Sequence, residues 1–450
     1  MLTYELKKSP GVPLYEALYR NIRGDILTGK LPAHTKLPSK RALAENLEVS
    51  KITVETAYGQ LLEEGYIRSV EKVGYFVEPI LVQSAPAEKI PHREEPCSEE
   101  TGPGPEKFPF SVWSRLQREV MLDYGEKLLL PLLNQGSYEL RRAIADHLAD
   151  FRGMNVDPGN ILVGAGTDFL YNLLIQLLGR DKTYAVEEPG YGKIRKIYAA
   201  GGVSCVSAMM DDKGVVPGSL GRAGVLHISP AHHFPTGLVT PVSRRLELLR
   251  WAREQEGYII EDDYDSEFRF DAHPMPTMMS LDHSGRVVYM NTFSKSLAPS
   301  IRVSYLVLPE EMMGKFREKL GFYSCTVSGF EQYTLARFLS RGHFEKHINR
   351  MRRFYRRRRN RILEILRDCP LAPRLTIREA DAGLHFLVEV DTDLTDEALV
   401  ALCGRAGLEV RALSSYYHTP VPEQVLHTLV VNYAALREED LEKALNKLLG

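Results

Sequence analysis

The first 78 residues begin with apolar positions that recur at helical spacing. Four of them lie in a segment that Pro13 can open and Gly29 can end: Leu14, Leu18, Ile22 and Ile26. Two further helical segments follow. Ser39 can cap KRALAENL, and Ser50 can cap KITVETAYGQLLEE, which Gly65 can end. Because only two residues separate these segments, the pattern predicts two helices joined by a tight turn.

Beyond Gly65 the apolar period changes from helical to two. YIRSV and YFV alternate around a short turn that contains Glu71, Lys72 and Gly74, which predicts a small β-hairpin. A helix, a helix-turn-helix and a hairpin in this order predict a winged helix-turn-helix domain of the α+β class over residues 1–78.

Residues 79–107 are rich in Pro, Glu and Ser and lack sustained periodicity, which predicts an extended linker. From residue 108 to 450, short apolar runs alternate with helical patterns: ILVGAG, TYAVEE, VLHIS, YIIED, VVYM and VSYLVL. This alternation predicts an α/β domain with a largely parallel sheet and helices on both faces. From about residue 340 a long arginine-rich helical segment and mixed segments predict a smaller C-terminal α+β lobe.

Composition narrows the class of protein further. The 450 residues carry a net charge of −2, which argues against a chain devoted to nucleic acid, although a local DNA-binding surface remains compatible with it. The five cysteines form no CxxC pair, so neither a disulfide framework nor a metal site is expected. The N-terminus MLTYELKKSPG has no apolar export segment, and charged or polar residues interrupt the most apolar window. We therefore expect a cytoplasmic protein with no membrane partner.

The second helix of the predicted helix-turn-helix opens with short polar or cationic side chains. In such motifs this helix presents its first turns to the base edges, while helix N-termini and cations hold phosphates. The candidate DNA contacts are Ser39, Arg41, Ser50, Lys51, Thr53, Thr56 and, at the wing tip, Lys72. The alternative is a helical oligomerisation module, because residues 1–78 hold 11 basic and 10 acidic residues.

Polar clusters follow four of the predicted strands, where an open α/β sheet lines its ligand crevice: GAGTD, SPAHHFPTG, EDDYD and NTFSK. Together they suit pyridoxal phosphate, which needs an amine, a carboxylate for its ring nitrogen and a phosphate cradle. Lys295 can supply the amine and Asp262 the carboxylate. Tyr264 can bond the ring hydroxyl, and Tyr191 can stack on the ring. Each piece alone is more often an ordinary surface feature.

The phosphate cradle is expected at the start of a helix and in the turn after a strand. Its candidates are Gly166, Thr167, Asp168, Thr292, Ser294 and Arg302. Asp168 can contribute only its backbone N–H, because its carboxylate would repel a dianion.

Two resemblances sharpen these expectations. LPSKRALAENLEVSKITVETAYGQLLEEGYI resembles the GntR-type winged helix, although the wing VEKVGYFV departs from that family's basic tip. Residues from about 102 to 450 resemble a fold-type-I aminotransferase domain through EEPGY, SPAHHFPTG, EDDYDSEFRF, TFSKSLAPSIR and AGLH. The whole chain therefore resembles the MocR subfamily of bacterial transcription regulators. The resemblance implies that Lys295 carries the Schiff base with the cofactor, that Asp262 meets the pyridine nitrogen, and that the protein is a homodimer with swapped DNA-binding domains.

Two features depart from or add to that pattern. Where aminotransferases carry a carboxylate-binding arginine in a pattern such as LRLGFA, this chain has LVVNYA, with Val430 in the corresponding place. Arg411 or Lys193 are the candidate substitutes. The run RMRRFYRRRRNR, residues 350–361, is either a solvated surface helix with acidic partners or a second contact to the DNA backbone.

Three functions are compatible with these observations. The first, which the sequence favours, is a transcription regulator that binds a double-stranded DNA operator at the nucleoid and senses pyridoxal phosphate, an amine or an amino acid at Lys295. The second is an active aminotransferase that carries a DNA-binding domain. The third is an effector-binding regulator that has lost the cofactor. Val430 argues against sustained amino-acid turnover, so we expect a sensor with at most a residual half-transamination.

Overall fold

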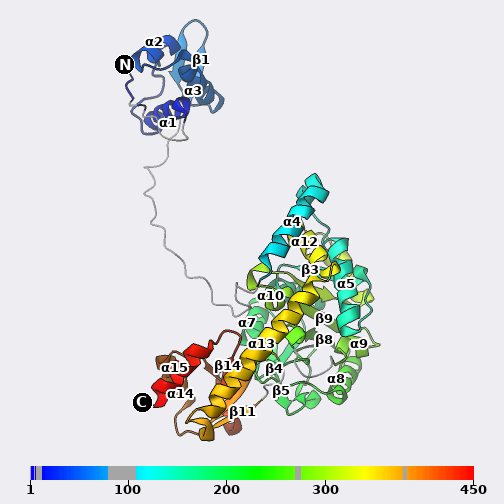
Figure 1. Cartoon of the computed structure of the whole chain (residues 1–450). Helices are drawn as coiled ribbons and strands as arrows, with labels where there is room; N and C mark the ends of the chain where they lie inside the picture. Colours follow the sequence, from blue (N-terminus) through cyan, green and yellow to red (C-terminus); the bar gives the residue numbers. More distant parts are fainter. Residues whose placement is uncertain are drawn as a thin grey trace. The chain divides into compact units, whose positions relative to one another are not determined.

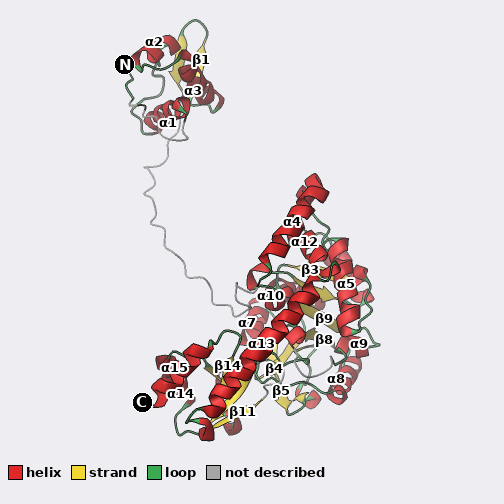
Figure 2. Ribbon diagram, viewed as in Figure 1, coloured by secondary structure: helices red, strands yellow, loops and turns green. Residues whose placement is uncertain are grey.

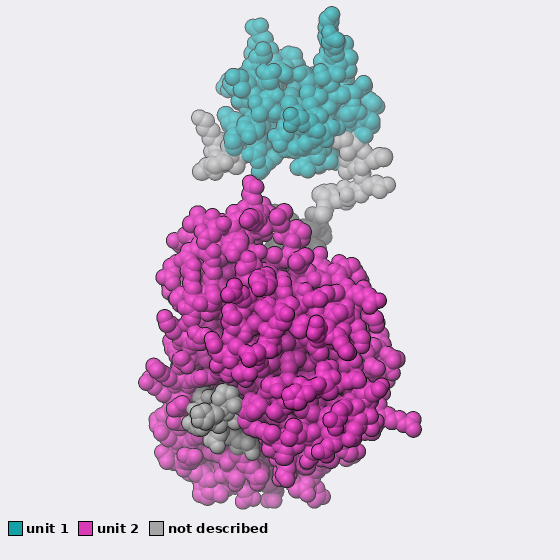
Figure 3. Space-filling view, turned by 90° about the vertical axis from the view of Figure 1, so that its right-hand side faces the viewer, with its two compact units in different colours: residues 1–97 teal, residues 98–450 magenta. Residues whose placement is uncertain are grey.

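The computed structural model describes residues 2–4, 6, 13–79, 108–268, 275–378 and 383–449. It separates the chain into two compact units, residues 1–97 and residues 98–450 (Figure 3). Most of the predicted linker, residues 80–107, lies outside the described residues.

Unit 1 contains three helices and a hairpin, as the apolar pattern predicts. The elements are α1 (Leu14–Leu27), α2 (Lys40–Asn46), α3 (Lys51–Glu63), β1 (Ile67–Val70) and β2 (Gly74–Val77), with β1 and β2 antiparallel (Figure 1). The Ser39 hydroxyl accepts a hydrogen bond from the Ala42 N–H, and the Ser50 hydroxyl accepts one from the Thr53 N–H, so both predicted caps are present. Pro13 is the cap residue of α1 and not its first helical residue.

The core of unit 1 joins all of these elements. The four apolar positions of α1 differ in one respect from the prediction: Leu18, Ile22 and Ile26 are buried, whereas Leu14 is only partly so. They pack with residues of α3 and both strands, among them Val54, Tyr58, Leu61, Ile67 and Val77. This arrangement confirms the winged helix-turn-helix fold.

Unit 2 is built on an eight-stranded sheet with the order β3-β10-β9-β8-β7-β4-β5-β6. Its strands are β3 (Ile161–Gly164), β4 (Thr183–Glu188), β5 (Ser204–Asp211), β6 (Gly214–Val215), β7 (Val225–Ile228), β8 (Tyr258–Asp262), β9 (Val287–Thr292) and β10 (Ser304–Val307). β10 is antiparallel to both of its neighbours and β6 is antiparallel to β5, whereas β4, β5, β7, β8 and β9 pair in parallel. The sheet is therefore largely parallel, as predicted.

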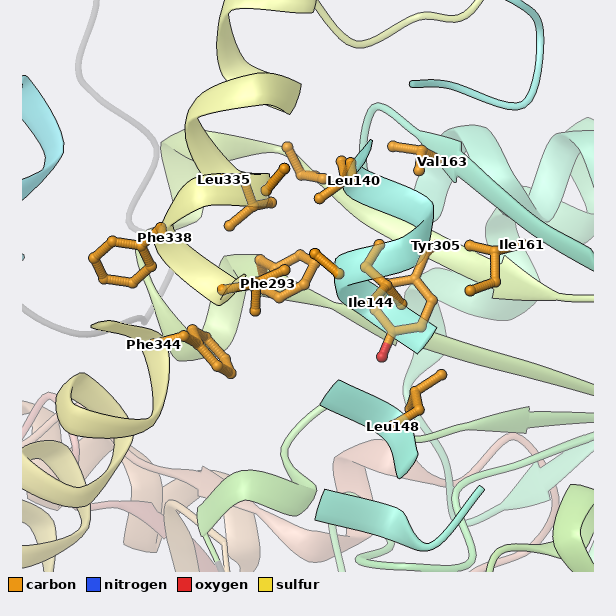
Figure 4. Packing of buried hydrophobic residues seen from close by; sticks show 14 of the residues in the cluster. Leu140, Ile144, Leu148, Ile161, Val163, Phe293, Tyr305, Leu335, Phe338 and Phe344 are labelled. Atoms are coloured by element: carbon orange, nitrogen blue, oxygen red, sulfur yellow. The ribbon is translucent and has the colours of Figure 1, made fainter. Parts of the chain in front are cut away.

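Helices cover both faces of this sheet (Figure 2). They are α4 (Phe110–Tyr124), α5 (Tyr138–Arg152), α6 (Thr167–Leu178), α7 (Gly192–Ala200), α8 (Val242–Glu254), α9 (Met278–Leu281), α10 (Phe293–Ser296), α11 (Glu310–Leu320) and α12 (Gly329–Ser340). Successive strand residues point to opposite faces. Ile161, Val163 and Tyr305 accordingly pack with α5 and α12 (Figure 4), whereas Leu162 and Leu306 pack with α6 and α11.

A smaller lobe completes unit 2. Its four strands are β11 (Leu375–Arg378), β12 (His385–Val390), β13 (Arg411–Ala412) and β14 (Thr428–Asn432), in the order β11-β12-β14-β13. The helices α13 (His343–Asp368), α14 (Asp396–Ala406) and α15 (Glu438–Leu449) supply its core. α13 begins in the core of the large sheet with Phe344 and ends in the core of the small lobe with Leu366.

The arginine-rich run lies on α13, and several of its side chains are already paired. Arg359 is buried, Arg358 donates to the Ala434 carbonyl at 2.6 Å, and Arg361 lies within 4 Å of the carboxylates of Glu364, Glu438 and Glu442. Across the segments that the structure describes, no helix combines the length and apolar composition needed to cross a membrane.

Candidate functional site

Neighbouring parallel strands bring three of the predicted clusters together. β8 ends at Asp262 and β9 ends at Thr292, and Asp262 is the register partner of Met290 in β9. β7, which precedes the SPAHHFPTG segment, pairs with β8 on its other side. The polar residues that follow these three strands therefore lie at the same edge of the sheet.

Asp262 is a buried carboxylate with one oxygen held and one available. Its Oδ2 accepts a hydrogen bond from the Tyr171 hydroxyl at 2.6 Å and lies 3.5 Å from Nε2 of His227. The His227 Nδ1 in turn lies 2.7 Å from the Tyr198 hydroxyl. Asp262 Oδ1 is buried and has no hydrogen-bond partner among the described residues. An N–H donor such as a protonated pyridine nitrogen would satisfy this oxygen.

Burial keeps the surrounding phenols neutral. It raises the pKa of Tyr171 well above its ordinary value, and the adjacent Asp262 carboxylate raises it further. The pKa of Tyr198 is raised well above its ordinary value by the same burial. Tyr171 therefore remains a hydrogen-bond donor to Asp262.

Lys295 lies in α10, the short helix that follows β9. Thr292 caps this helix, because its hydroxyl accepts from the Ser294 N–H at 3.1 Å and from the Ser304 hydroxyl at 2.8 Å. The Thr292 hydroxyl thus holds the turn together. The hydroxyl oxygen of Ser294, in contrast, is buried without a hydrogen-bond partner in the described structure, so it can bond an incoming phosphate oxygen.

The remaining phosphate candidates meet at the start of α6. Gly166 is the cap residue of α6 with φ 88° and ψ 166°, a conformation that suits only glycine. A Cβ on Gly166 would lie 2.4 Å from the Nη2 atom of Arg302, so the guanidinium lies directly against this backbone. The Asp168 carboxylate lies 3.3 Å from Arg302 and 3.0 Å from the Lys193 ammonium. Thr167 begins α6 immediately after Gly166, as expected.

The two predicted tyrosines lie in an aromatic and histidine-rich group. Tyr191 is 49% exposed, and its ring meets Phe234 edge-on at 5.9 Å. The Tyr264 hydroxyl lies 3.5 Å from Nδ1 of His232, and that nitrogen lies 2.8 Å from Asp265. Tyr264 is largely enclosed, and this burial raises its pKa well above the ordinary value.

Several residues of this site were not predicted. They are Tyr171, Tyr198 and His227 around Asp262, together with His232, His233, Phe234 and His385. The rings of His232 and His385 lie 4.8 Å apart, although the two residues belong to different lobes. Burial lowers the pKa of His233 to about 3 and that of His385 well below its usual range, so both imidazoles are neutral. The motifs SPAHHFPTG and AGLH contain four of these residues: His232, His233, Phe234 and His385.

Val430 lies in an apolar cluster with Leu387 and Leu413, against Phe234 and Tyr416. Arg411 is the register partner of Val430 in β13, so both residues lie on the same face of the small sheet. The Arg411 guanidinium lies beside the Tyr416 phenol, where it opposes the rise that burial causes in the pKa of Tyr416. Lys193 and Arg411 are the two candidates to replace the carboxylate-binding arginine of aminotransferases. Lys193 is paired with Asp168, whereas Arg411 lies beside the apolar cluster.

The predicted DNA contacts divide into two groups. Arg41, Lys51 and Lys72 are exposed, and Arg41 forms an ion pair with Glu45 at 3.0 Å. The hydroxyls of Ser39 and Ser50 cap helices, that of Thr53 lies 2.8 Å from Ser50, and that of Thr56 donates to the Ile52 carbonyl. The three cations therefore extend from the surface of unit 1, whereas these hydroxyls take part in hydrogen bonds within it. Ile52 is 74% exposed and was not predicted as part of this surface.

Among the described residues, no three His, Cys, Asp or Glu side chains gather as a metal-binding group. Cys205, Cys325, Cys369 and Cys403 are free thiols, and Cys97 lies outside the described residues.

Comparison with known proteins gives both units a counterpart. Residues 14–77 match the family model of bacterial regulatory proteins of the gntR family, and residues 111–448 match that of aminotransferase class I and II. The chain is 35% identical to the uncharacterized HTH-type transcriptional regulator YdeL of Bacillus subtilis (strain 168), covering 99% of this chain and 98% of that protein. It is 32% identical to the probable rhizopine catabolism regulatory protein MocR of Rhizobium meliloti, covering 98% and 94%.

Solved structures match the fold of unit 2. A multiple substrate aminotransferase from Thermococcus profundus superposes with a TM-score of 0.67 at 24% identity, covering 78% of this chain and 89% of that one. An archaeal alanine:glyoxylate aminotransferase superposes with a TM-score of 0.68 at 22% identity, covering 78% and 88%.

Proposed function

Because the chain belongs to the MocR-type regulators of the GntR family, in which a DNA-binding winged helix is joined to a pyridoxal-phosphate-binding aminotransferase class I and II domain, we propose that unit 2 senses a primary amine through Lys295. The observation that carries this proposal is the buried Asp262 carboxylate, whose Oδ1 lacks a partner in the described structure, on the strand next to the one that leads to Lys295. When bound, pyridoxal phosphate supplies an aldehyde that condenses reversibly with primary amines.

Each candidate residue has a role that its contacts support. Asp262 would accept the pyridine N–H, with Tyr171 and His227 fixing its other oxygen. Arg302, the Ser294 hydroxyl and the N–H groups at the start of α6 would hold the phosphate. Tyr191 would stack on the ring, and Tyr264 would bond its hydroxyl. The Thr292 hydroxyl would position Lys295, because its oxygen accepts hydrogen bonds from Ser294 and Ser304 and its own O–H lies 3.5 Å from the Val303 carbonyl.

The effector would act by competing with Lys295. An amine that replaced Lys295 on the cofactor would free the lysine side chain and would bring the amine's own substituents against residues of both lobes. It can change DNA affinity only if it binds two states of the protein unequally. As a regulator of this kind the protein would act at the nucleoid, on an operator.

We also propose that the working form is a homodimer with exchanged DNA-binding domains. A run of large apolar side chains is exposed on α4 and on the segment between α4 and α5: Phe110, Met121, Leu122, Leu129, Leu130 and Leu133. Large apolar side chains that are exposed together in one segment of a chain are typical of a protein interface. A second copy covering it would pair two winged helices for two operator half-sites. Sedimentation velocity should show a dimer for the wild type and a monomer for a Leu122→Glu, Leu129→Glu variant.

The test of the sensing proposal is the visible absorption spectrum of the protein with pyridoxal phosphate, before and after borohydride, with mass mapping of the reduced peptide. We expect a visible band in the wild type, a reduced adduct on Lys295, and loss of both in Lys295→Ala. Lys315→Ala, an exposed lysine on α11, is the matched control. An adduct on other lysines only would contradict the proposal.

A second measurement separates sensing from catalysis. If the protein is a sensor, an amine that shifts the spectrum also shifts operator affinity, and a keto acid is not converted over many turnovers. Sustained conversion abolished by Lys295→Ala would instead favour an active aminotransferase.

A further inference from the structure

Ile52 is a large aliphatic side chain on the outer face of α3. It is the second residue of the helix and is 74% exposed. The buried residues Val54, Ala57, Tyr58 and Leu61 define the face of α3 that packs on the core. At about 100° per residue, Ile52 lies on the opposite side of the helix. The packing of unit 1 therefore does not account for an isoleucine at this position.

The polar side chains around Ile52 are engaged within the helix itself. The Ser50 and Thr53 hydroxyls lie 2.8 Å apart, and the Ser50 hydroxyl also caps α3. The Thr56 hydroxyl donates a hydrogen bond to the Ile52 carbonyl at 2.9 Å. At the start of the recognition helix, Ile52 and Lys51 are thus the large side chains left to meet a partner.

Gly59 adds an independent observation on the same face. It lies seven residues after Ile52, hence two turns along the same side of α3. A Cβ on Gly59 would meet no atom within 4 Å, so the packing of the described residues does not require glycine there. Glycine inside a helix costs about 1 kcal/mol relative to alanine. Close approach of an external partner to this face would explain its presence.

We propose that Ile52 packs against the C5-methyl group of a thymine in the major groove and sets a preference for thymine at one position of each operator half-site. The thymine methyl is the apolar group that the major-groove edge of a base pair presents, and apolar side chains are its complement. Gly59 lets the helix backbone lie close to the DNA further along the groove. This inference concerns the DNA-binding unit and does not depend on amine sensing.

The experiment starts from duplexes selected from a random pool by the full-length protein with pyridoxal phosphate. Each thymine of a selected duplex is then replaced by deoxyuridine, which removes only the methyl group. We expect one position per half-site at which this replacement weakens binding about fourfold, the fold-change that corresponds to about 0.8 kcal/mol for one buried methyl-sized group. Ile52→Ala should bind the thymine duplex more weakly and no longer distinguish it from the deoxyuridine duplex. Ile52→Val should retain part of the distinction.

Val73→Ala is the matched control, because Val73 is an exposed aliphatic residue, 49% accessible, next to the wing tip. It should leave the thymine preference at the Ile52-sensitive position unchanged. The proposal is overturned if Ile52→Ala weakens binding to thymine and deoxyuridine duplexes equally, or if no thymine replacement matters. It is also overturned if Ile52→Ala changes the oligomeric state and leaves the preference intact, since Ile52 would then face another protein chain.

Gly59→Ala tests the close approach separately. The variant should raise the thermal stability of unit 1 and weaken binding to thymine and deoxyuridine duplexes by the same factor. Unchanged affinity would remove Gly59 from the argument.

Discussion

Thr292 and Ser294 are two hydroxyl residues in one turn, and the structure predicts opposite consequences for their removal. The Thr292 hydroxyl accepts from the Ser294 N–H and from the Ser304 hydroxyl, which is buried completely. Thr292→Val removes a cap bond worth about 1 kcal/mol. It also leaves the Ser304 hydroxyl without its acceptor, at a cost of about 1–3 kcal/mol. We expect the free energy of unfolding to fall by about 2–4 kcal/mol.

Ser294→Ala should leave the stability of the cofactor-free protein within about 0.5 kcal/mol, because the buried Ser294 hydroxyl has no partner to lose in the described structure. If this hydroxyl bonds the phosphate, its loss should cost about 1.5–3 kcal/mol of binding, the range for hydrogen bonds to charged groups. The dissociation constant for pyridoxal phosphate would then rise by about 10- to 150-fold.

Both variants can be measured with the same two assays. Chemical unfolding of the cofactor-free protein gives stability, and titration with pyridoxal phosphate, followed by absorbance, gives affinity. The reasoning would be refuted if Ser294→Ala lost stability as Thr292→Val does, or if it bound pyridoxal phosphate as tightly as the wild type.

Four further changes test other parts of unit 2. Gly166→Ala should weaken pyridoxal phosphate binding at least tenfold, because the added Cβ would push Arg302 aside. Gly153→Ala is the control, since Gly153 also has a positive φ but has open space around it. This variant should lose only about 1 kcal/mol of stability in chemical unfolding and should retain the cofactor. Arg152→Met should lower the free energy of unfolding by about 3–5 kcal/mol, because it leaves the fully buried Asp263 carboxylate without the ion pair it forms at 3.0 Å. Arg411→Gln should weaken the spectral response to β-alanine about tenfold and leave that to propylamine unchanged, if Arg411 binds the effector carboxylate. Burial raises the pKa of the Glu187 carboxyl to about 8, above its value in the unfolded chain. The group therefore stabilises the fold at low pH, and this contribution is lost as the pH rises toward 8. In the Glu187→Gln variant, the free energy of unfolding should therefore fall less between pH 5 and 8 than in the wild type.

The elements of both units followed from local chemistry. The caps at Ser39 and Ser50 needed only a hydroxyl before an apolar helical pattern, and the strands of the large sheet needed only their short apolar runs. Lys295 and Asp262 could be proposed because each directly follows or ends such a run. What these residues share is a signal contained within a few neighbouring positions.

The unpredicted residues carry no such local signal. Tyr171 lies inside the apolar pattern of α6, where it looks like a core residue, yet its hydroxyl reaches Asp262 across 91 positions of sequence. His385 belongs to β12 of the small lobe and meets His232 only because the two lobes pack together. Pairings of this kind depend on the register of strands and the packing of lobes, which a single sequence does not specify.

Short hydroxyl residues show a second limit of the sequence, because the property that makes them ligand contacts also makes them caps. Ser50 and Thr292 were both expected to touch a ligand, and each is engaged in holding the first turn of a helix. Ser294 differs from Thr292 in that its hydroxyl oxygen has no hydrogen-bond partner in the described structure. In unit 1 the same distinction applies at the start of α3, where the Ser50 hydroxyl caps the helix while the side chains of Lys51 and Ile52 are exposed. If the proposal for Ile52 is right, Lys51 would meet a phosphate and Ile52 would meet a thymine methyl group.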